Sequence, residues 1–483
     1  MKCAAYYTGV HQYPNKKNML RFFKQYYPIR NIFFVFGEGV FIFGSVWMAC
    51  YIIHGAEWFI LERWLLVKIF LITSVCQLCL YYQDLYDLKI TDSLIELGIR
   101  LLQALGFAAI FLALIYIIFP QAIIGTGTFI VSICFVVVLI VSWRLGYKLI
   151  LNRGLFNQNI LLLGSSDLVN KIKMEISERK DCGYTLALEL SEPDNPTRLG
   201  ELKNPDQLVG ERFEGLAEVA TALGIKKIIA GFKEKRNCFP TRELLECRVA
   251  GIEVIEGNSF YEMLTGKLTV EQLNPSWLIF SGGFEKTRIR RFLKRSTDLI
   301  LSLGMLICLC PLILLLAILI KIDSRGPVIF SQERMGEKRK IYKVHKFRSM
   351  VADAEKISGP VWAKDNDERV TRVGRIIRMI RIDEVPQLWN VFKGEMSFVG
   401  PRPEREFFVK ELEKQIPYYD QRFSVKPGIT GWAQINYGYG ATVEDAIEKL
   451  NYDMFYIKNM SFWMDLVIVL RTTKIVLFGK GAR

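Results

Sequence analysis

Residues 378–403 of the chain read RMIRIDEVPQLWNVFKGEMSFVGPRP, a stretch that sets two adjacent carboxylates among arginines. The two acids are Asp383 and Glu384, and a proline and an apolar run follow them. A carboxylate can attack phosphorus and carry it covalently, while arginines hold the anionic phosphate oxygens. An apolar segment of membrane length, residues 299–320, lies upstream. Together these features predict phosphate chemistry carried out at a membrane.

The pattern around the two acids predicts a helix that has Pro386 in its first turn and continues into the apolar run. Free N–H groups and the dipole at such a helix start favour a bound phosphate. Neighbouring residues on a helix point about 100° apart, so Asp383 and Glu384 are expected to differ in role. One would attack phosphorus and the other would bind a divalent cation, for which Mg²⁺ suits carboxylate and phosphate oxygens. The structural alternative is an exposed acidic pair salt-bridged to Arg381.

A chain of 483 residues exceeds one ordinary core and suggests two or three domains. Hydrophobic residues make up 51% of it and are concentrated in a few blocks, which indicates an integral membrane protein with soluble parts. The net charge is +14, and basic residues cluster beside the apolar blocks. This placement favours contact with anionic lipid and phosphate-bearing substrates, and no nucleic-acid-binding motif is visible. The chain has only three histidines, which argues against a His-rich metal site and against histidine-based catalysis.

Four apolar blocks in the first third of the chain each approach the 20 or so residues that a spanning helix needs. They are residues 32–53, 65–81, 101–119 and 122–143. The region 1–150 is therefore predicted to be a four-helix transmembrane domain. Basic residues precede the first block, and Arg144, Lys148 and Arg153 follow the fourth, so both ends of this domain are expected in the cytoplasm. The first block starts too late and is too long for a cleavable signal peptide.

The region 155–275 alternates strand-like and helical patterns, which predicts a Rossmann-like α/β domain with a parallel sheet. The strand-like segments are residues 160–164, 226–231 and 251–255. The first turn, Gly164-Ser-Ser-Asp167, lacks the second and third glycines of a dinucleotide fingerprint. We therefore expect this domain to serve regulation or assembly rather than cofactor binding.

The fifth apolar block predicts a re-entrant membrane helix over residues 298–322. Pro311 falls at its middle, where proline bends a helix, and both flanks are positive. Four earlier spans also leave the chain in the cytoplasm, where nucleotide-activated substrates are found. The region 286–483 is thus predicted to be a mostly helical catalytic domain facing the cytoplasm. Its aromatic-rich tail, residues 451–479, suits helices lying in the membrane interface, with ordinary core helices as the alternative.

Six short motifs occur in a fixed order through this last region. They are Lys346-Phe-Arg-Ser-Met350, Arg369-Val-Thr371, Asp383-Glu-Val-Pro-Gln-Leu388, Asn390-Val-Phe-Lys-Gly394, Ser397-Phe-Val-Gly-Pro-Arg-Pro403 and Pro427-Gly-Ile-Thr-Gly-Trp-Ala-Gln434. This set resembles the bacterial polyprenyl-phosphate phosphoglycosyl transferases, the monotopic sugar transferases that initiate exopolysaccharide synthesis. The four apolar blocks and the α/β region resemble the larger members. The ending, residues 456–483, resembles the branch associated with exopolysaccharide and exosortase systems.

The resemblance implies a function in the bacterial inner (cytoplasmic) membrane. Asp383 would attack the sugar-bearing phosphate of a UDP-sugar, releasing UMP, and polyprenyl (undecaprenyl) phosphate would then take the phosphosugar. Glu384 would match the magnesium-binding carboxylate. Arg378 and Arg402 match phosphate-holding arginines, and the same role is expected, on weaker grounds, for Lys346 and Arg348, which could instead pair structurally with acids.

The resemblance also has departures. Cys310-Pro311 stands where Ser-Pro often marks the bend of the membrane helix, so the proline is expected to matter and the cysteine to be replaceable. Tyr437-Gly-Tyr-Gly440 stands where many relatives carry Gly-Arg, which leaves the sugar or nucleotide preference open.

Two other functions remain as alternatives at this point. The α/β region would suit a membrane-anchored NAD-dependent nucleotide-sugar epimerase or dehydratase, although it has no Tyr-x-x-x-Lys pair. A non-catalytic scaffold for polysaccharide assembly is the second. The transmembrane domain would serve either a homodimer or the binding of downstream glycosyltransferases. The sequence leaves these roles and the identity of the sugar open.

Overall fold

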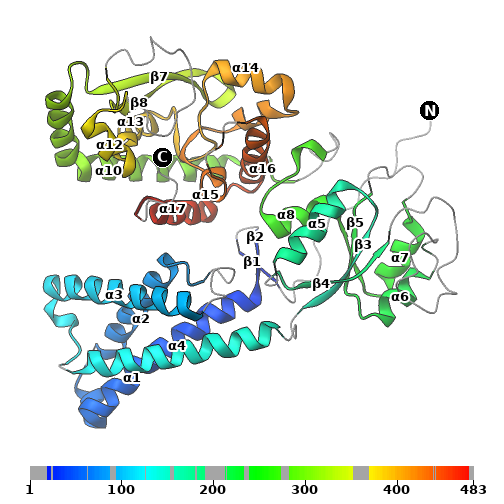
Figure 1. Ribbon diagram of the computed structural model, residues 1–483, viewed down its shortest axis with the longest axis horizontal. Coiled ribbons are helices and arrows are strands. Elements are labelled where there is room, and N and C mark those ends of the chain that lie inside the picture. Colours follow the sequence, from blue (N-terminus) through cyan, green and yellow to red (C-terminus); the bar gives the residue numbers. More distant parts are fainter. Residues whose placement is uncertain are drawn as a thin grey trace. The chain divides into compact units, whose positions relative to one another are not determined.

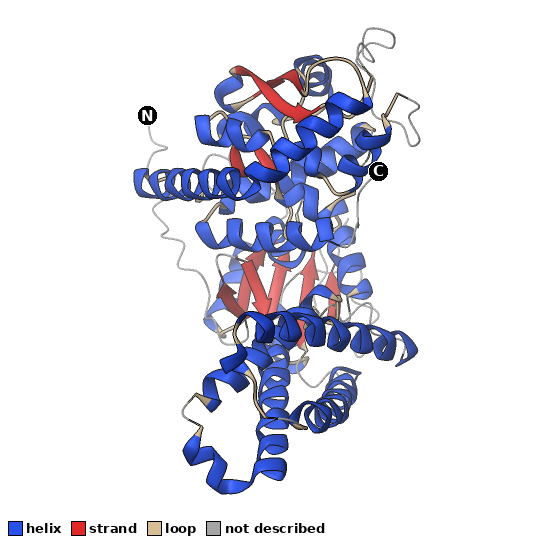
Figure 2. Cartoon of the chain, turned by 90° about the vertical axis from the view of Figure 1, so that its left-hand side faces the viewer, coloured by secondary structure: helices blue, strands red, loops and turns tan. Residues whose placement is uncertain are grey.

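The computed structural model describes most of the chain as helix, with the strands gathered in small sheets (Figures 1 and 2). The described residues are 19–22, 25–62, 64–86, 94–125, 127–152, 157–179, 182–190, 213, 215–232, 239–272, 282–284, 286–351, 369–438, 440 and 442–477. The chain divides into two compact units. Unit 1 comprises residues 1–22 and 26–257, and unit 2 comprises residues 23–25 and 258–483.

Four long apolar helices make up the first half of unit 1, after two short strands. They are β1 (Met19–Phe22), β2 (Gln25–Pro28), α1 (Ile29–Leu61), α2 (Leu65–Tyr82), α3 (Leu94–Ile118) and α4 (Thr128–Asn152). α1 packs against α4 and α2, and α2 packs against α3. All four are long and apolar enough to cross a membrane, as is a fifth helix in unit 2. The turn η1 (Pro120–Ala122) and the loop that follows it precede α4. This helix therefore begins and ends later in the sequence than the predicted block at 122–143.

The structure changes the interpretation of one basic residue in this region. Arg144 does not follow the fourth helix but lies inside it, buried against Glu38 of α1. Its Nε donates to Glu38 Oε1 at 2.8 Å, and its Nη1 donates to the carbonyl oxygen of Leu85 at 2.6 Å. A charge can be buried in an apolar bundle only when it is paired in this way. Arg144 therefore joins α1 and α4, and it is not a free charge flanking the membrane.

The second half of unit 1 is a four-stranded parallel sheet with helices, as the sequence predicted at this coarse level. Its elements are β3 (Gln158–Leu163), α5 (Asp167–Glu178), β4 (Tyr184–Leu190), α6 (Leu216–Ala222), β5 (Lys227–Ala230), α7 (Thr241–Val249) and β6 (Glu253–Glu256). The strand order is β4-β3-β5-β6, and the strands run side by side in Figure 2. β4 was not predicted. It is an edge strand, and polar residues interrupt its apolar pattern.

Unit 2 is built mainly of helices around short strands. Its elements are α8 (Gly257–Thr265), η4 (Val270–Gln272), α10 (Arg288–Asp323), β7 (Ile329–Met335), η5 (Glu337–Arg339), β8 (Ile341–Phe347), α12 (Arg372–Met379), η6 (Ile382–Glu384), α13 (Gln387–Lys393), β9 (Ser397–Val399), α14 (Glu406–Gln415), η7 (Tyr419–Ser424), β10 (Gly428–Thr430), α15 (Trp432–Asn436), α16 (Val443–Asn459) and α17 (Phe462–Leu477). β7 and β8 form an antiparallel hairpin, and β9 pairs with β10 in parallel.

The boundary between the units falls earlier than the sequence predicted. Residues 258–272 cluster with unit 2 instead of closing the α/β domain at 275. Leu268 and Val270 enter the core of unit 2, each 1% exposed. The Nε1 of Trp432 donates to the carbonyl oxygen of Gly266 at 2.7 Å, which fastens this segment to the Gly-Trp-Ala-Gln motif.

α10 is one helix with Pro311 inside it, and it begins ten residues before the predicted re-entrant segment at 298–322. Near its start, Arg295 donates from Nη1 to the carbonyl oxygen of Val391 at 2.7 Å. At its other end, Arg348 donates from Nη2 to the carbonyl oxygen of Ser324 at 2.6 Å. Both ends are thus fastened to the same unit.

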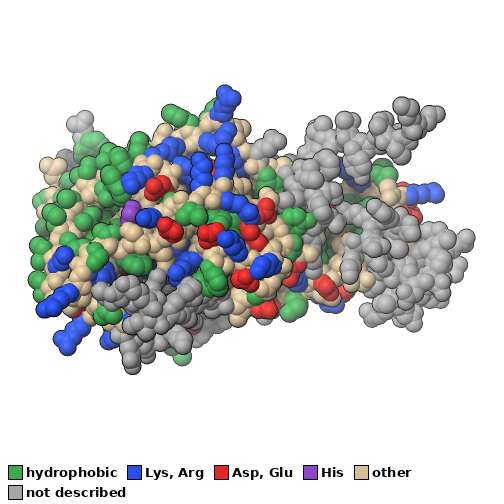
Figure 3. Space-filling view, turned by 90° about the horizontal axis from the view of Figure 1, so that it is seen from above, with side chains coloured by type: hydrophobic (Ala, Val, Ile, Leu, Met, Phe, Trp, Pro, Cys, Tyr) green, Lys and Arg blue, Asp and Glu red, His purple; other side chains and the backbone are tan. Residues whose placement is uncertain are grey.

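Many apolar side chains in the middle of α10 are exposed. These include Ile300, Leu303, Ile307, Leu314, Leu315 and Ile318. Hydrophobic side chains gather toward the left of the face shown in Figure 3, and Lys and Arg side chains are scattered over its middle.

The tail of the chain divides between the two kinds of helix that the sequence allowed. α16 is an ordinary core helix, with Met454 and Tyr456 almost wholly buried. α17 buries one side, at Met464 and Ile468, and exposes apolar side chains on another, including Trp463.

Candidate active site

The two acids lie on a tight turn that precedes a helix. α12 ends at Met379, and Arg381 then takes up a left-handed conformation with φ of 54°, which breaks the helical path. Asp383 and Glu384 follow in η6, and α13 begins only at Gln387. Pro386 was predicted to lie in the first turn of this helix, but it is the residue just before the helix, and the two acids lie on the short turn that precedes it.

Asp383 is buried, with 9% of its surface exposed. No side chain among the described residues donates a hydrogen bond to its carboxylate. Burial raises its pKa above the ordinary value, and the negative charge of Glu384 adds to this, while Lys346, Arg378 and Arg402 oppose it. The result is a carboxylate that is more basic than usual and is not occupied by a bond to the protein.

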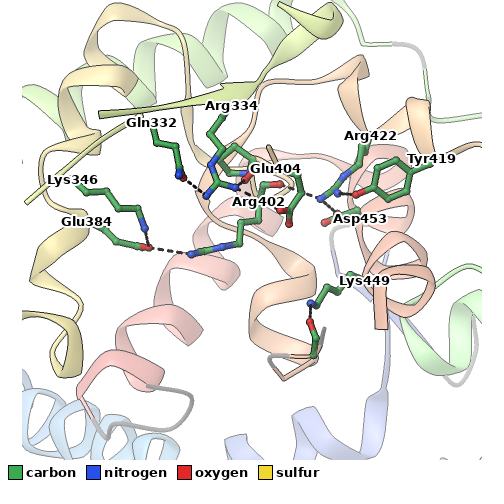
Figure 4. Close-up of polar contacts among 12 residues, drawn as sticks. Gln332, Arg334, Lys346, Glu384, Arg402, Glu404, Tyr419, Arg422, Lys449 and Asp453 are labelled. Carbon is green, nitrogen blue, oxygen red and sulfur yellow. Dashed lines mark hydrogen bonds and ion pairs between the residues drawn. The ribbon is translucent and has the colours of Figure 1, made fainter. Parts of the chain in front are cut away.

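Glu384 has the opposite electrostatic environment. Its Oε1 accepts hydrogen bonds from Lys346 Nζ at 2.9 Å and from Arg402 Nη2 at 3.2 Å (Figure 4). Burial alone would raise the pKa of this carboxyl group, but the charges of Lys346 and Arg402 outweigh burial and hold the pKa below its usual value. Glu384 is thus ionised at any physiological pH.

The predicted site residues come together only in part. Lys346 at the end of β8 and Arg402 in the loop after β9 both reach Glu384, and Arg378 in the last turn of α12 lies close enough to influence Asp383. Arg348 is directed elsewhere, because its Nη2 bonds to Ile320 and Ser324 at the end of α10.

The alternative of an exposed acidic pair does not fit these surroundings. Asp383 is buried, and only 13% of the Glu384 side chain is exposed. The ion pairs of Glu384 are made with Lys346 and Arg402, and the charge of Arg381 adds to theirs in lowering its pKa.

A second group of charged residues, which the sequence did not predict, contacts the backbone of the loop that carries Arg402. Arg422 and Asp453 form a buried ion pair of 3.0 Å, and Arg422 also donates to the carbonyl oxygen of Arg402 at 3.1 Å. Arg334 donates to the carbonyl oxygen of Pro403 at 3.2 Å. One signal was available. Asp453 stands one position before Met454 within the most apolar stretch of α16, where an acid requires a buried partner.

The two acids suit a magnesium ion that is held partly by substrate phosphates and water better than a metal ion that is held by protein side chains alone. No group of three or more His, Cys, Asp or Glu side chains suited to a metal ion occurs in the described part of the chain. Mg²⁺ usually takes one or two carboxylates, with substrate phosphates and water completing its coordination. Both cations on Glu384 bond to Oε1, so Oε2 can accept a further ligand. Glu384 is therefore the residue that would hold the ion.

Comparison with known proteins agrees with this arrangement. A family model described as "Bacterial sugar transferase" matches residues 289–479. An exopolysaccharide production protein of Rhizobium leguminosarum bv. phaseoli is 42% identical over 195 residues, which are 39% of this chain and 98% of that protein. The chain therefore belongs to the bacterial sugar transferase family, and the family resemblance predicted from the sequence is confirmed.

Longer relatives share the same region. A UDP-N-acetylgalactosamine-undecaprenyl-phosphate N-acetylgalactosaminephosphotransferase of Aeromonas hydrophila is 43% identical over 242 residues, or 50% of this chain and 56% of that protein. A UDP-glucose:undecaprenyl-phosphate glucose-1-phosphate transferase of Escherichia coli K12 is 43% identical over 189 residues, or 38% of this chain and 40% of that protein. The chain thus spans about half the length, or less, of these curated relatives. Family and apolar helices together indicate a membrane-associated protein.

Proposed function

We propose that this chain transfers a sugar 1-phosphate from a UDP-sugar to polyprenyl (undecaprenyl) phosphate, releasing UMP, as the first membrane step of exopolysaccharide synthesis. The observation that carries the proposal is the contrast between the two adjacent acids. Asp383 is buried with a raised pKa, whereas Glu384 is held ionised by Lys346 and Arg402. A nucleophile and a charge organiser need these opposite properties.

The reaction proceeds by two displacements at phosphorus. A carboxylate oxygen of Asp383 attacks the sugar-bearing phosphorus, the bond from that phosphorus to the bridging pyrophosphate oxygen breaks, and UMP leaves with the electron pair. An oxygen of polyprenyl phosphate then attacks the aspartyl-bound phosphorus and releases the Asp383 carboxylate. Each step exchanges one phosphate linkage for another, so neither requires an oxidant or an external energy source.

The cations around the acids hold the substrate phosphates. Arg378 and Arg402 bind phosphate oxygens, with Lys346 balancing the charge of Glu384 between them. A magnesium ion bound by Glu384 would supply further neutralisation of the phosphate oxygens as negative charge shifts to the leaving group.

The membrane anchor supports the same reaction, because the donor is soluble in water and the acceptor is a lipid. Arg295 and Arg348 fasten the two ends of α10 to unit 2, while its middle exposes apolar side chains. A helix that enters the cytoplasmic leaflet, bends at Pro311 and returns accounts for both observations. It holds the two acids at headgroup level on the cytoplasmic side.

The test is a UMP-release assay on the purified full chain, with polyprenyl phosphate present or absent, against a panel of UDP-sugars. The relatives named above act on N-acetylgalactosamine and glucose donors, so these head the panel. If the chain is an enzyme, the wild type should release UMP and Asp383→Asn should not. If it is a non-catalytic scaffold, the wild type should release none. Radiolabelled donor should label a peptide containing Asp383. Release of UDP, or label found only elsewhere, would end the proposal.

A further inference from the structure

The loop that carries Arg402, residues 399–404, is held through its carbonyl oxygens. Pro401 and Pro403 flank Arg402 and have no backbone N–H, so the usual donors are missing on both sides of it. The carbonyl oxygens accept hydrogen bonds instead. The carbonyl oxygen of Val399 accepts from Lys294 Nζ and the Tyr456 hydroxyl, and that of Pro401 accepts from Gly428 N. Arg422 Nη2 donates to the carbonyl oxygen of Arg402, Arg334 Nη1 to that of Pro403, and Met335 N to that of Glu404.

Arg422 differs from the other donors because it holds the carbonyl oxygen of Arg402 itself, at 3.1 Å. Its side chain is fixed in turn by buried partners. Nη2 also donates to Asp453 Oδ2 at 3.0 Å, and Nη1 donates to the hydroxyl of Tyr419 (Figure 4). Arg422 is 7% exposed, and Asp453 and Tyr419 are 2% exposed.

A continuous chain of polar contacts therefore runs from the core to the acids. It passes from Asp453 to Arg422, to the backbone of Arg402, and through the Arg402 side chain to Glu384 (Figure 4). A buried ion pair by itself is weak evidence for stability, because apolar residues of similar volume often serve as well. An apolar residue could not, however, donate to the carbonyl oxygen of Arg402.

We propose that Arg422, anchored by Asp453, is a positioning residue that directs the Arg402 side chain toward Glu384 and the bound phosphates. Arg422 is buried and acts through the backbone of Arg402. The inference rests on the proposed function, since it concerns the same reaction.

The test is a double-mutant cycle on the full chain with Arg402→Gln, Arg422→Gln and both together. The measured quantity is kcat/KM for UMP release. We expect a loss of about 100-fold for Arg402→Gln, which is the usual scale for removing one donor to a developing charge. Arg422→Gln should lose about 10- to 100-fold. The double variant should fall within about threefold of Arg402→Gln alone, because residues that act through one another are not additive.

Two further variants separate positioning from folding. Arg422→Lys keeps a cation that can donate to the Arg402 carbonyl oxygen or to Asp453, so it should recover part of the activity. Lys458→Gln is the matched control, because it breaks a 2.6 Å ion pair with Glu262 in the same unit, and Lys458 is not among the donors given above for residues 399–404. It should lower the unfolding temperature, leave kcat/KM near the wild-type value, and be additive with Arg402→Gln.

If Arg422→Gln fails to fold, Asp453→Asn takes its place in the cycle, because it leaves Arg422 present but removes its charged anchor. Equal fold-losses for either variant with and without the Arg402 side chain would overturn the positioning role. If the wild type is nevertheless active and Asp383→Asn is inactive, the proposed function stands without the positioning role. A wild type that releases no UMP with any UDP-sugar would overturn both.

Discussion

Replacing Glu384 by Gln tests the site most directly, because it keeps the shape of the side chain and removes only its charge. Lys346 Nζ and Arg402 Nη2 would then face a neutral oxygen instead of an ionised one. Hydrogen bonds to charged groups contribute about 1.5–3 kcal/mol and neutral ones about 0.5–1.5 kcal/mol. The loss is thus about 1 kcal/mol per bond, and less at Arg402, whose side chain is 39% exposed and screened by solvent.

The cost in folding stability should therefore be about 1–2 kcal/mol, or about 2–8 °C in Tm for a unit of this size. The pKa of Glu384 is lower in the folded state than its ordinary value of 4.5. Its contribution to stability is therefore fully present above pH 4.5 and is lost as the pH falls toward the folded-state pKa. The wild type and the variant should accordingly converge in Tm under strongly acidic conditions.

The cost in turnover should be larger, because the charge also organises the phosphate site. A loss of about 10²–10³-fold is expected, which corresponds to about 3–4 kcal/mol. The assay is UMP release titrated with Mg²⁺, and the variant should require more Mg²⁺ and stay slow at saturation. Glu406→Gln is the control, since Glu406 is half exposed and pairs with Lys410 on the surface of α14. Wild-type turnover at saturating Mg²⁺ would refute the assigned role.

Three other changes give independent checks. Lys346→Met removes the charge that most lowers the pKa of Asp383, so the acid limb of kcat/KM against pH should move to higher pH; an unmoved limb would contradict the nucleophile assignment. Met454→Ala opens a cavity in the core of unit 2 and should cost about 2–5 kcal/mol in chemical denaturation, while a cost under 1 kcal/mol would argue against that core. Cysteines introduced one at a time after Arg325 should resist an impermeant reagent in intact cells, and labelling from outside would exclude the re-entrant helix.

The sequence predicted that the two adjacent acids lie among cations, and the structure brings Lys346 and Arg402 to Glu384, while the roles of these residues stay a prediction. Asp383 and Glu384 were identified as acids of unequal role, and their environments do differ. Lys346 and Arg348 could not be separated, because residues two apart on a strand share a face. β8 ends at Phe347, however, so Arg348 leaves the strand and turns to α10.

Long-range partners were the part that local patterns could not supply. Glu38 and Arg144 lie 106 positions apart, and nothing near either one indicates the other. The role proposed for Arg422 likewise depends on its bonds to Asp453 and to the carbonyl oxygen of Arg402, which lies 20 positions away in the sequence. The domain boundary moved for the same reason, since Leu268 and Val270 are apolar in any case and only the fold decides which core they enter.

The opposite pKa shifts of two neighbouring acids follow from how many cations each one meets. Glu384 receives two hydrogen-bonded cations, which is enough to overcome burial. Asp383 feels the same charges without such a bond, so burial and the charge of Glu384 prevail and its pKa rises. A less shielded, more basic carboxylate is the better nucleophile toward phosphorus, while a permanently ionised one is the better metal ligand. The backbone turn η6 directs only Glu384 at Lys346 and Arg402, and this difference is the basis of the two roles that we propose for the acids.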